Sequence, residues 1–319
     1  MKRTIRVFSI IILIIMVTLA CQMSGGNTNS SSDMVNTQAA MALTQTAMKS
    51  GPAESMPTQQ VGQAATNTPQ QKAPTNTQKA PTAQDIQAMI NSSNILVYEE
   101  IAGYPQYITY VARALKSVGG HQVYVGDAMG TLMEKLNSGT KWDLIIVAAE
   151  ARKAISGDYW TEIKTQVDNG AALVAETWYL NKINGGKIAP FLYECGVQVQ
   201  ADWQKRVGDN RINYGIFWVE PDNPVFNKPN QVSSFTASLT NPAWYGDVGD
   251  FLIPREGSSA KMLASHTAGQ NQTYGLITEC MDGRVILQTF DSHDYPTDGM
   301  VALWENYIIY TLTNHFSAK

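Results

Sequence analysis

Aromatic residues are missing from a long part of this chain, since no Phe, Trp or Tyr occurs between Phe8 and Tyr98. A segment without aromatics buries too little apolar surface to offset the entropy that it loses on ordering. The segment is instead rich in Ser, Thr, Asn, Gln, Ala and Pro. The similar short segments that recur within it are much shorter than the roughly 20 residues of the smallest solenoid repeats. We therefore predict a disordered tether over residues 21–91.

Basic residues are also few, with 23 Lys and Arg against 27 Asp and Glu and a formal net charge of −4. No cluster of them forms the basic patch with which nucleic-acid-binding proteins neutralise phosphates. No spacing of His, Cys and Asp matches that of a known metal site. The sequence therefore predicts no nucleic-acid partner and no bound metal, and it indicates no other cofactor.

The apolar run at the N-terminus, residues 7–20, is too short for an ordinary membrane span, which needs about 20 residues. Lys2, Arg3 and Arg6 precede it, and a basic start followed by a short apolar run is typical of a secretory signal. We predict a signal peptide over residues 1–20. Its removal takes three positive charges from a net charge of −4, which leaves −4 − 3 = −7.

The end of the apolar run, residues 17–21, reads VTLAC. This segment resembles the bacterial lipobox, in which the cysteine is diacylated and becomes the new N-terminus, although Thr18 stands where that family more often has Leu. The resemblance implies that Cys21 carries lipid, and more than one acyl chain gives stable anchoring. We expect an extracytoplasmic chain anchored to membrane lipid through acylated Cys21. A plain signal peptide cleaved nearby, or an uncleaved anchor, is the alternative.

Only two cysteines follow Cys21, at Cys195 and Cys280. Outside the cytoplasm two such cysteines can form a disulfide. Two free buried thiols are the alternative, because the sequence does not show that the two positions are adjacent.

The composition changes near Asn94, beyond which lie all seven Trp and all fourteen Tyr. Short apolar runs alternate there with helical stripes, and that order predicts a parallel sheet with helices on both faces. Over residues 92–319 we therefore predict one α/β domain, a flavodoxin-like, doubly wound, mainly parallel sheet. Residues 197–265 are expected to form an irregular β-rich insertion. The expected strands are 95–98, 122–125, 142–149, 171–175 and 284–290, and the expected helices are 104–118, 128–136, 156–167 and 300–312.

Several short segments carry a resemblance to a known family. They read ILVY at 95–98, WDLIIV at 142–147, VDNGAALV at 167–174 and GRVILQT at 283–289, the last running on to His293 and Asp294. An NPVF turn lies between them at 223–226. Together these segments resemble the class I glutamine amidotransferase-like superfamily and, within it, the trehalose-utilisation (ThuA-like) branch. The resemblance implies the same α/β fold over most of residues 94–319.

The resemblance also implies a place for a catalytic nucleophile, which in active members is a cysteine on a tight turn after a central strand. Here that place follows residues 171–175 and reads ETW, with no cysteine and no elbow glycines. Nucleophilic catalysis needs a thiolate or an activated hydroxyl beside a base. Thr177 is a weak substitute for the cysteine, so glutaminase activity is not expected.

The carboxyl ends of the predicted strands are rich in acidic residues. Ligands of open α/β sheets bind beyond these ends. Carboxylates that converge with a histidine and aromatic rings can hold a hard cation, act as an acid–base pair or bind a sugar. Alternatively, each acid is a solvated strand end, a helix cap or the partner of an arginine. The candidate ligand-binding residues are Glu99, Glu100, Tyr104, Glu150, Glu176, Trp178, Asp291 and His293, and the candidate catalytic residues are Glu176, His293 and Asp294.

Three functions fit this sequence. The favoured one is a non-enzymatic binding module for a small polar ligand or carbohydrate. The second is a hydrolase or isomerase that acts on sugars through the acids and His293. The third is a protein-interaction domain without a small-molecule site, whose protein partner the sequence does not identify. His293 within hydrogen-bond reach of Glu176 or Glu150, beside an open pocket, would favour the enzyme.

Overall fold

The computed structural model describes the chain from residue 80 to residue 318 with several gaps. The predicted signal peptide, Cys21 and the tether up to residue 79 lie outside the described residues, as do Tyr104, Glu150 and Trp178. No helix within the described part is both long enough and apolar enough to cross a membrane. The described residues are 80–100, 108–149, 157–177, 180, 186–205, 215–236, 247–269 and 272–318.

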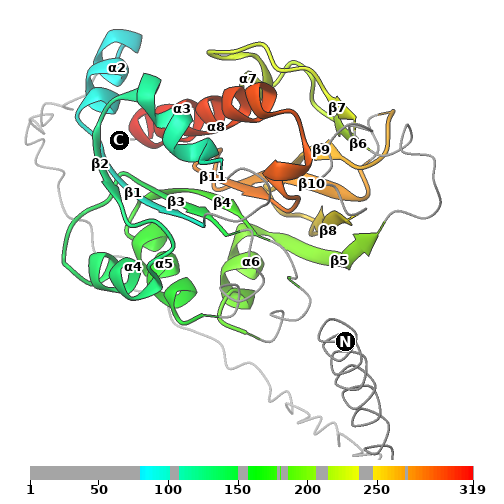
Figure 1. Ribbon diagram of the computed structural model, residues 1–319, viewed down its shortest axis with the longest axis horizontal. Coiled ribbons are helices and arrows are strands. Elements are labelled where there is room, and N and C mark those ends of the chain that lie inside the picture. Colours follow the sequence, from blue (N-terminus) through cyan, green and yellow to red (C-terminus); the bar gives the residue numbers. More distant parts are fainter. Residues whose placement is uncertain are drawn as a thin grey trace, which may run out of the picture. The chain divides into compact units, whose positions relative to one another are not determined.

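The centre of the fold is a sheet whose parallel half has the strand order β2-β1-β3-β4-β11 (Figure 1). Residues of β3 and β4 are buried throughout, as expected of apolar strands covered on both faces. This order is that of a flavodoxin-like α/β fold, as predicted. The strands are β1 (Asn94–Glu99), β2 (His121–Tyr124), β3 (Leu144–Ala148), β4 (Ala172–Glu176) and β11 (Val285–Gln288).

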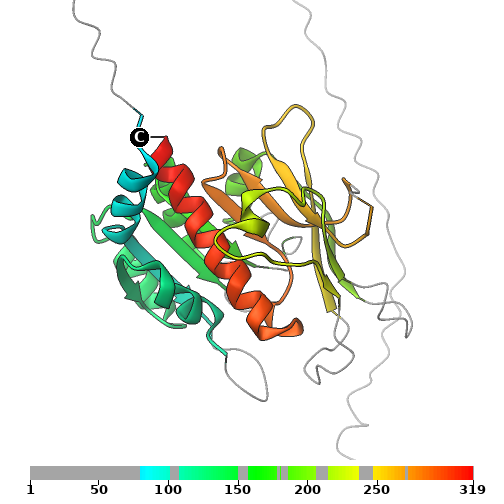
Figure 2. The same ribbon diagram turned by 90° about the horizontal axis from the view of Figure 1, so that it is seen from above.

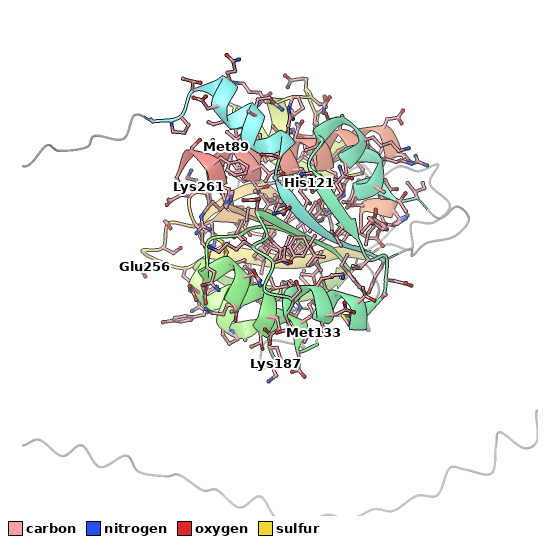
Figure 3. All side chains as sticks on the ribbon, turned by 90° about the vertical axis from the view of Figure 1, so that its left-hand side faces the viewer. Met89, His121, Met133, Lys187, Glu256 and Lys261 are labelled. Carbon is pink, nitrogen blue, oxygen red and sulfur yellow. A yellow bond between two sulfur atoms is a disulfide. The ribbon has the colours of Figure 1, made fainter. Side chains whose placement is uncertain are left out.

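Helices cover both faces of this sheet, so alternate residues of a strand point into two separate cores. Ile95 and Val97 of β1 face the core beneath α3 and α8, while Leu96 and Tyr98 face the core beneath α4, α5 and α6. Figure 2 shows α8 crossing one face beside α2 and α3. Figure 3 shows side chains filling both layers, with Lys187 at the surface. The helices are α3 (Tyr110–Val118), α4 (Met129–Leu136), α5 (Tyr159–Asp168), α6 (Ala189–Cys195) and α8 (Thr297–Ser317).

Antiparallel strands extend the sheet beyond β11 in the order β10-β9-β6-β7, and β8 pairs with both β10 and β5. At the crossing of β8 and β10, a Cβ atom on Gly275 would lie 2.5 Å from the Leu252 carbonyl oxygen. Only glycine allows the two backbones to approach so closely. The elements are β5 (Val197–Lys205), β6 (Gly215–Trp218), α7 (Pro224–Asn227), β7 (Phe235–Thr236), β8 (Asp247–Pro254), β9 (Lys261–Ser265) and β10 (Gly275–Cys280).

The folded part begins earlier than the sequence indicated. Helix α2 (Ala83–Asn91) contacts α8, and its Ile90 is buried in the core, so a tether that runs to residue 91 is too long. A capping box starts the helix: the Thr82 hydroxyl accepts a hydrogen bond from the Asp85 N–H, and the Asp85 carboxylate accepts one from the Thr82 N–H. This pair satisfies two backbone donors that a helix N-terminus otherwise leaves open.

Cys195 and Cys280 form a disulfide, one of the two alternatives that the sequence left open. Cys195 ends α6, and Cys280 ends β10, with their Cα atoms 5.4 Å apart. The bridge therefore ties the helical layer to the antiparallel part of the sheet.

Candidate functional site

The structure brings acidic residues together at the carboxyl edge of the parallel strands. Glu99 ends β1 and Glu176 ends β4, while Asp291 and His293 follow β11. Ser292, between the last two, donates its backbone N–H to Oε1 of Glu176 over 2.7 Å. The turn after β11 thus lies directly against the end of β4.

Glu176 is almost completely buried, with an exposed fraction of 2%. Its Oε2 accepts a second hydrogen bond from the Ser292 hydroxyl over 2.9 Å. Burial raises the pKa of Glu176 well above its ordinary value, and the negative charge of Asp291 acts in the same direction. The two hydrogen bonds from Ser292 favour the charged form and oppose that rise.

The Ser292 hydroxyl is the centre of a buried polar network. It accepts hydrogen bonds from the indole N–H of Trp304 over 3.1 Å and from the Gln288 amide over 2.9 Å. The Tyr307 hydroxyl donates to the side-chain carbonyl oxygen of Gln288 over 3.1 Å. All four of these side chains have an exposed fraction of 0%. The network therefore links Glu176 to β11 and to α8, inside the protein.

Glu99 caps a helix. Its carboxylate accepts hydrogen bonds from the backbone N–H groups of Val111 (2.8 Å) and Ala112 (3.1 Å) in the first turn of α3, and from the Tyr124 hydroxyl (2.6 Å). A negative charge at a helix N-terminus is favourable. Burial nevertheless raises the pKa of Glu99, against the effect of these hydrogen bonds. Glu99 matches the helix-cap alternative that the sequence left open.

Glu100 and the Thr177 hydroxyl lie at the same edge. Glu100 accepts a hydrogen bond from the Tyr98 hydroxyl over 2.8 Å, and the ring of Tyr159, at the start of α5, stacks on that of Tyr98. The Thr177 hydroxyl is buried and finds no hydrogen-bond partner among the described residues. Buried polar atoms normally have a partner in the protein, in water or in a ligand.

Asp291 and His293 lie closest to the surface within this group. Asp291 accepts a hydrogen bond from the His293 backbone N–H over 2.8 Å, and its Oδ1 lies 3.4 Å from Nδ1 of the imidazole. The imidazole packs edge-on against the ring of Tyr110, at the start of α3. Asp294, the third candidate here, is 8% exposed, and its N–H donates to the Asp291 carbonyl.

No group of three or more His, Cys, Asp or Glu residues within the described segments is arranged to hold a metal ion. The three described glutamates of the carboxyl edge instead engage donors of the protein: Glu99 those of α3, Glu100 that of Tyr98, and Glu176 those of Ser292.

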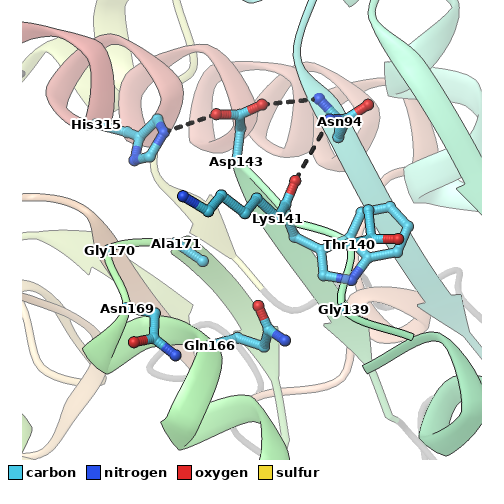
Figure 4. A pocket seen from close by; sticks show the side chains of 11 residues that line it. Asn94, Gly139, Thr140, Lys141, Asp143, Gln166, Asn169, Gly170, Ala171 and His315 are labelled. Carbon is cyan, nitrogen blue, oxygen red and sulfur yellow. Dashed lines mark hydrogen bonds and ion pairs between the residues drawn. The ribbon is translucent and has the colours of Figure 1, made fainter. Parts of the chain in front are cut away.

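Sequence reasoning missed a pocket at the opposite edge of the sheet, where the parallel strands begin (Figure 4). It is lined by residues that include Asp143, just before β3, and His315, in the last turn of α8. The sequence directed attention to the carboxyl ends of the strands alone. Asp143 was visible as an acid directly before a buried strand, but its pairing with His315 joins residues 172 positions apart.

Comparisons with known proteins find similarity in structure and no match in sequence. No family model matches the chain, and no curated protein matches it. Among solved structures, the chain is similar to a protein of Thermoplasma acidophilum described as a candidate subunit of GMP synthase. The similarity has a TM-score of 0.41 and 12% sequence identity, and it covers 68% of this chain and 92% of the other.

Proposed function

We propose that this chain is an extracytoplasmic lipoprotein whose α/β domain binds a small polar ligand or carbohydrate and performs no nucleophilic catalysis. The lipid is attached at Cys21. The domain is a degenerate relative of the class I glutamine amidotransferase-like enzymes, of the ThuA-like branch. The observation that carries the proposal is the position after β4, where such an enzyme would hold its nucleophile.

The residues at that position are buried and make structural contacts. A nucleophile must be exposed to substrate and activated by a neighbouring base. Glu176 has an exposed fraction of 2%, and both of its carboxylate oxygens accept hydrogen bonds from Ser292. The Thr177 hydroxyl is buried and makes no hydrogen bond to a described residue, so no described base activates it.

One feature of the carboxyl edge supports a polar ligand. Asp291 and His293, which are both partly exposed, combine a carboxylate with an imidazole. Hydroxyl groups of a sugar can hydrogen-bond to such groups.

A sugar hydrolase is the second candidate, because the raised pKa of Glu176 beside Asp291 resembles the acid and base pair of glycosidases. The burial of Glu176 disfavours it, since the acid must reach the glycosidic oxygen.

Binding should appear as a rise in melting temperature when mono- and disaccharides are added to the chain carrying Cys21→Ser, which removes the lipid site. Asp291→Asn should abolish that rise, because it removes the charge while an amide oxygen still accepts the His293 N–H. Asp168→Asn, on the exposed side of α5, is the matched control and should leave the rise unchanged.

Two results would contradict the proposal. If no sugar or other small polar compound shifts the melting temperature, the protein-interaction alternative is favoured. If the chain hydrolyses a sugar and Glu176→Gln abolishes the hydrolysis, the domain is an enzyme.

The proposed lipidation and membrane attachment of the protein can be tested separately. Cells that express the chain should incorporate labelled palmitate into it, and the protein should sediment with membranes. Cys21→Ser should lose both properties, because no thiol then remains for the lipid. Thr18→Leu moves the segment towards the usual lipobox and should keep both. Equal labelling of the Cys21→Ser chain would show that lipid is not attached there.

A further inference from the structure

The pocket at the amino edge of the sheet has the size of a ligand site. Its volume is about 690 Å³, and small-molecule sites typically have about 300 to 1,000 Å³. Its walls are Asn94 at the start of β1, the loop 139–143 before β3, Gln166 in the last turn of α5, residues 169–171 after that helix, and His315. The pocket thus lies between three strands, α5 and α8, at the edge opposite to Glu176.

Hydrogen bonds hold one wall of the pocket in place. Asp143 accepts one from the Asn94 N–H at Oδ2 over 2.9 Å, and its Oδ1 lies 3.0 Å from Nε2 of His315. The His315 side chain is 4% exposed, and its ring packs edge-on against Phe316. A carboxylate bonded to one ring nitrogen fixes the orientation of an imidazole and directs its other nitrogen elsewhere. Asp143 therefore fixes the orientation of the His315 imidazole in the pocket wall.

Amides and a lysine complete the pocket. The Gln166 amide donates to the Leu136 carbonyl over 2.8 Å, an arrangement that keeps the Gln166 carbonyl oxygen as an acceptor. Asn169 lies beside it, and Figure 4 shows the Lys141 side chain extended over the pocket towards His315. One cation and two amides, from the loop before β3 and the end of α5, thus border the same space.

One lysine and one aspartate line this space, and an arginine lies behind its wall. The Arg284 guanidinium donates to the carbonyls of Gly170 and Ala171, which belong to the pocket wall, so a second cation lies directly behind it. Asp143 is the one carboxylate among the lining residues, and its two oxygens are already bonded to Asn94 and His315. A ligand that enters would meet the ammonium group of Lys141 together with amide donors and acceptors.

We infer that this pocket binds a small hydroxylated organic acid of the sugar-acid class. Its carboxylate would pair with Lys141, and its hydroxyl groups would bond to the amides of Gln166 and Asn169. A charge-assisted hydrogen bond is stronger than a neutral one, so the acid is preferred over the corresponding neutral sugar. This site is separate from the carboxyl edge and does not rest on the function proposed for it.

The test compares glucuronate with glucose, which differ by the carboxylate, in calorimetric titrations of the full-length chain in detergent. Glucuronate should bind at least about tenfold more tightly, the size of one hydrogen bond to a charged group. Lys141→Met keeps the aliphatic stem, removes the charge and should abolish the difference. Lys187→Met is the matched control, because that exposed lysine pairs with Asp158 at the start of α5.

Three results would overturn the inference: equal affinity for glucuronate and glucose, unchanged glucuronate binding in Lys141→Met, or no binding of glucuronate at millimolar concentration. Asp291→Asn distinguishes binding at the amino edge from binding at the carboxyl edge. It should leave glucuronate binding intact even if it abolishes a sugar response at the carboxyl edge. Loss of glucuronate binding in Asp291→Asn would move the ligand to that edge and refute the amino-edge site.

Discussion

Ser292→Ala is expected to lower the free energy of unfolding by about 3 kcal/mol, because it removes one hydroxyl that serves three buried groups. Trp304 would lose the acceptor of its indole N–H, and Glu176 would lose a donor to its carboxylate. Gln288 would keep only the Phe290 carbonyl for its amide N–H. Unmet hydrogen bonds in the interior, above all those of a charged group, destabilise the folded state more than an average hydrogen bond stabilises it.

Urea denaturation of the two chains measures this difference, and Thr311→Val provides the matched control. The Thr311 hydroxyl is also fully buried, but it donates to the carbonyls of Tyr307 and Ile308, which belong to its own helix α8. Its removal leaves no donor without an acceptor, so the expected loss is below about 1 kcal/mol. Similar small losses in both variants would show that the Ser292 network does not stabilise the fold.

Removal of the disulfide should have a still larger effect. Cys195 and Cys280 are 85 residues apart, and in the chain-entropy model a crosslink over a loop of that length contributes about 4.6 kcal/mol. The double variant Cys195→Ala/Cys280→Ala should therefore unfold at a clearly lower urea concentration. The bridge also joins two layers, α6 and β10, whose separation exposes apolar core around both cysteines.

A reductant distinguishes the effect of losing the disulfide from the effect of replacing the two cysteine side chains. In a Cys21→Ser background, where no third thiol is present, dithiothreitol should lower the melting temperature of the bridged chain and leave that of the double variant unchanged. If the reductant changes neither chain, the cysteines are not bridged in solution. If the double variant is as stable as its parent, the crosslink contributes no net stability.

The inner strands of the parallel half were predictable because they are buried on both faces. Residues 144–148 and 172–176 are continuous apolar runs, interrupted only by Glu176 at the very end, and such runs are visible without knowledge of their neighbours. Strand β10 is also buried throughout, but it was missed because polar residues interrupt its apolar run. It contains Thr278 and Glu279, and the buried Glu279 is compensated by Lys261 and Tyr310 from other elements.

Helix α2 was missed because a long, polar, aromatic-free segment precedes it. The capping box of Thr82 and Asp85 was readable as a local start signal. Ile90 is buried in the core, and Ile86 and Met89 pack against the same core. These contacts depend on residues far along the chain and are not visible in the local sequence.

The meeting of Glu176 with the turn after β11 could be expected, since parallel strands end at a common edge. The hydrogen bonds that Glu176 makes there could not be expected. They come from Ser292, and the Ser292 hydroxyl is in turn bonded to Gln288 of β11 and Trp304 of α8. The same limit applies to the amino-edge pocket, where Asp143 acquires its role from His315, far along the chain.

The bridge between Cys195 and Cys280 also determines how the protein responds to proteases. A single cut of the backbone anywhere between these two residues leaves both fragments covalently joined. A nicked molecule would migrate as one chain in a non-reducing gel and as two in a reducing gel. The C-terminal fragment, which carries β11 and α8, would remain attached to the fragment that begins at the N-terminus. Such a link would keep the strand β11 and the helix α8 attached to a nicked domain.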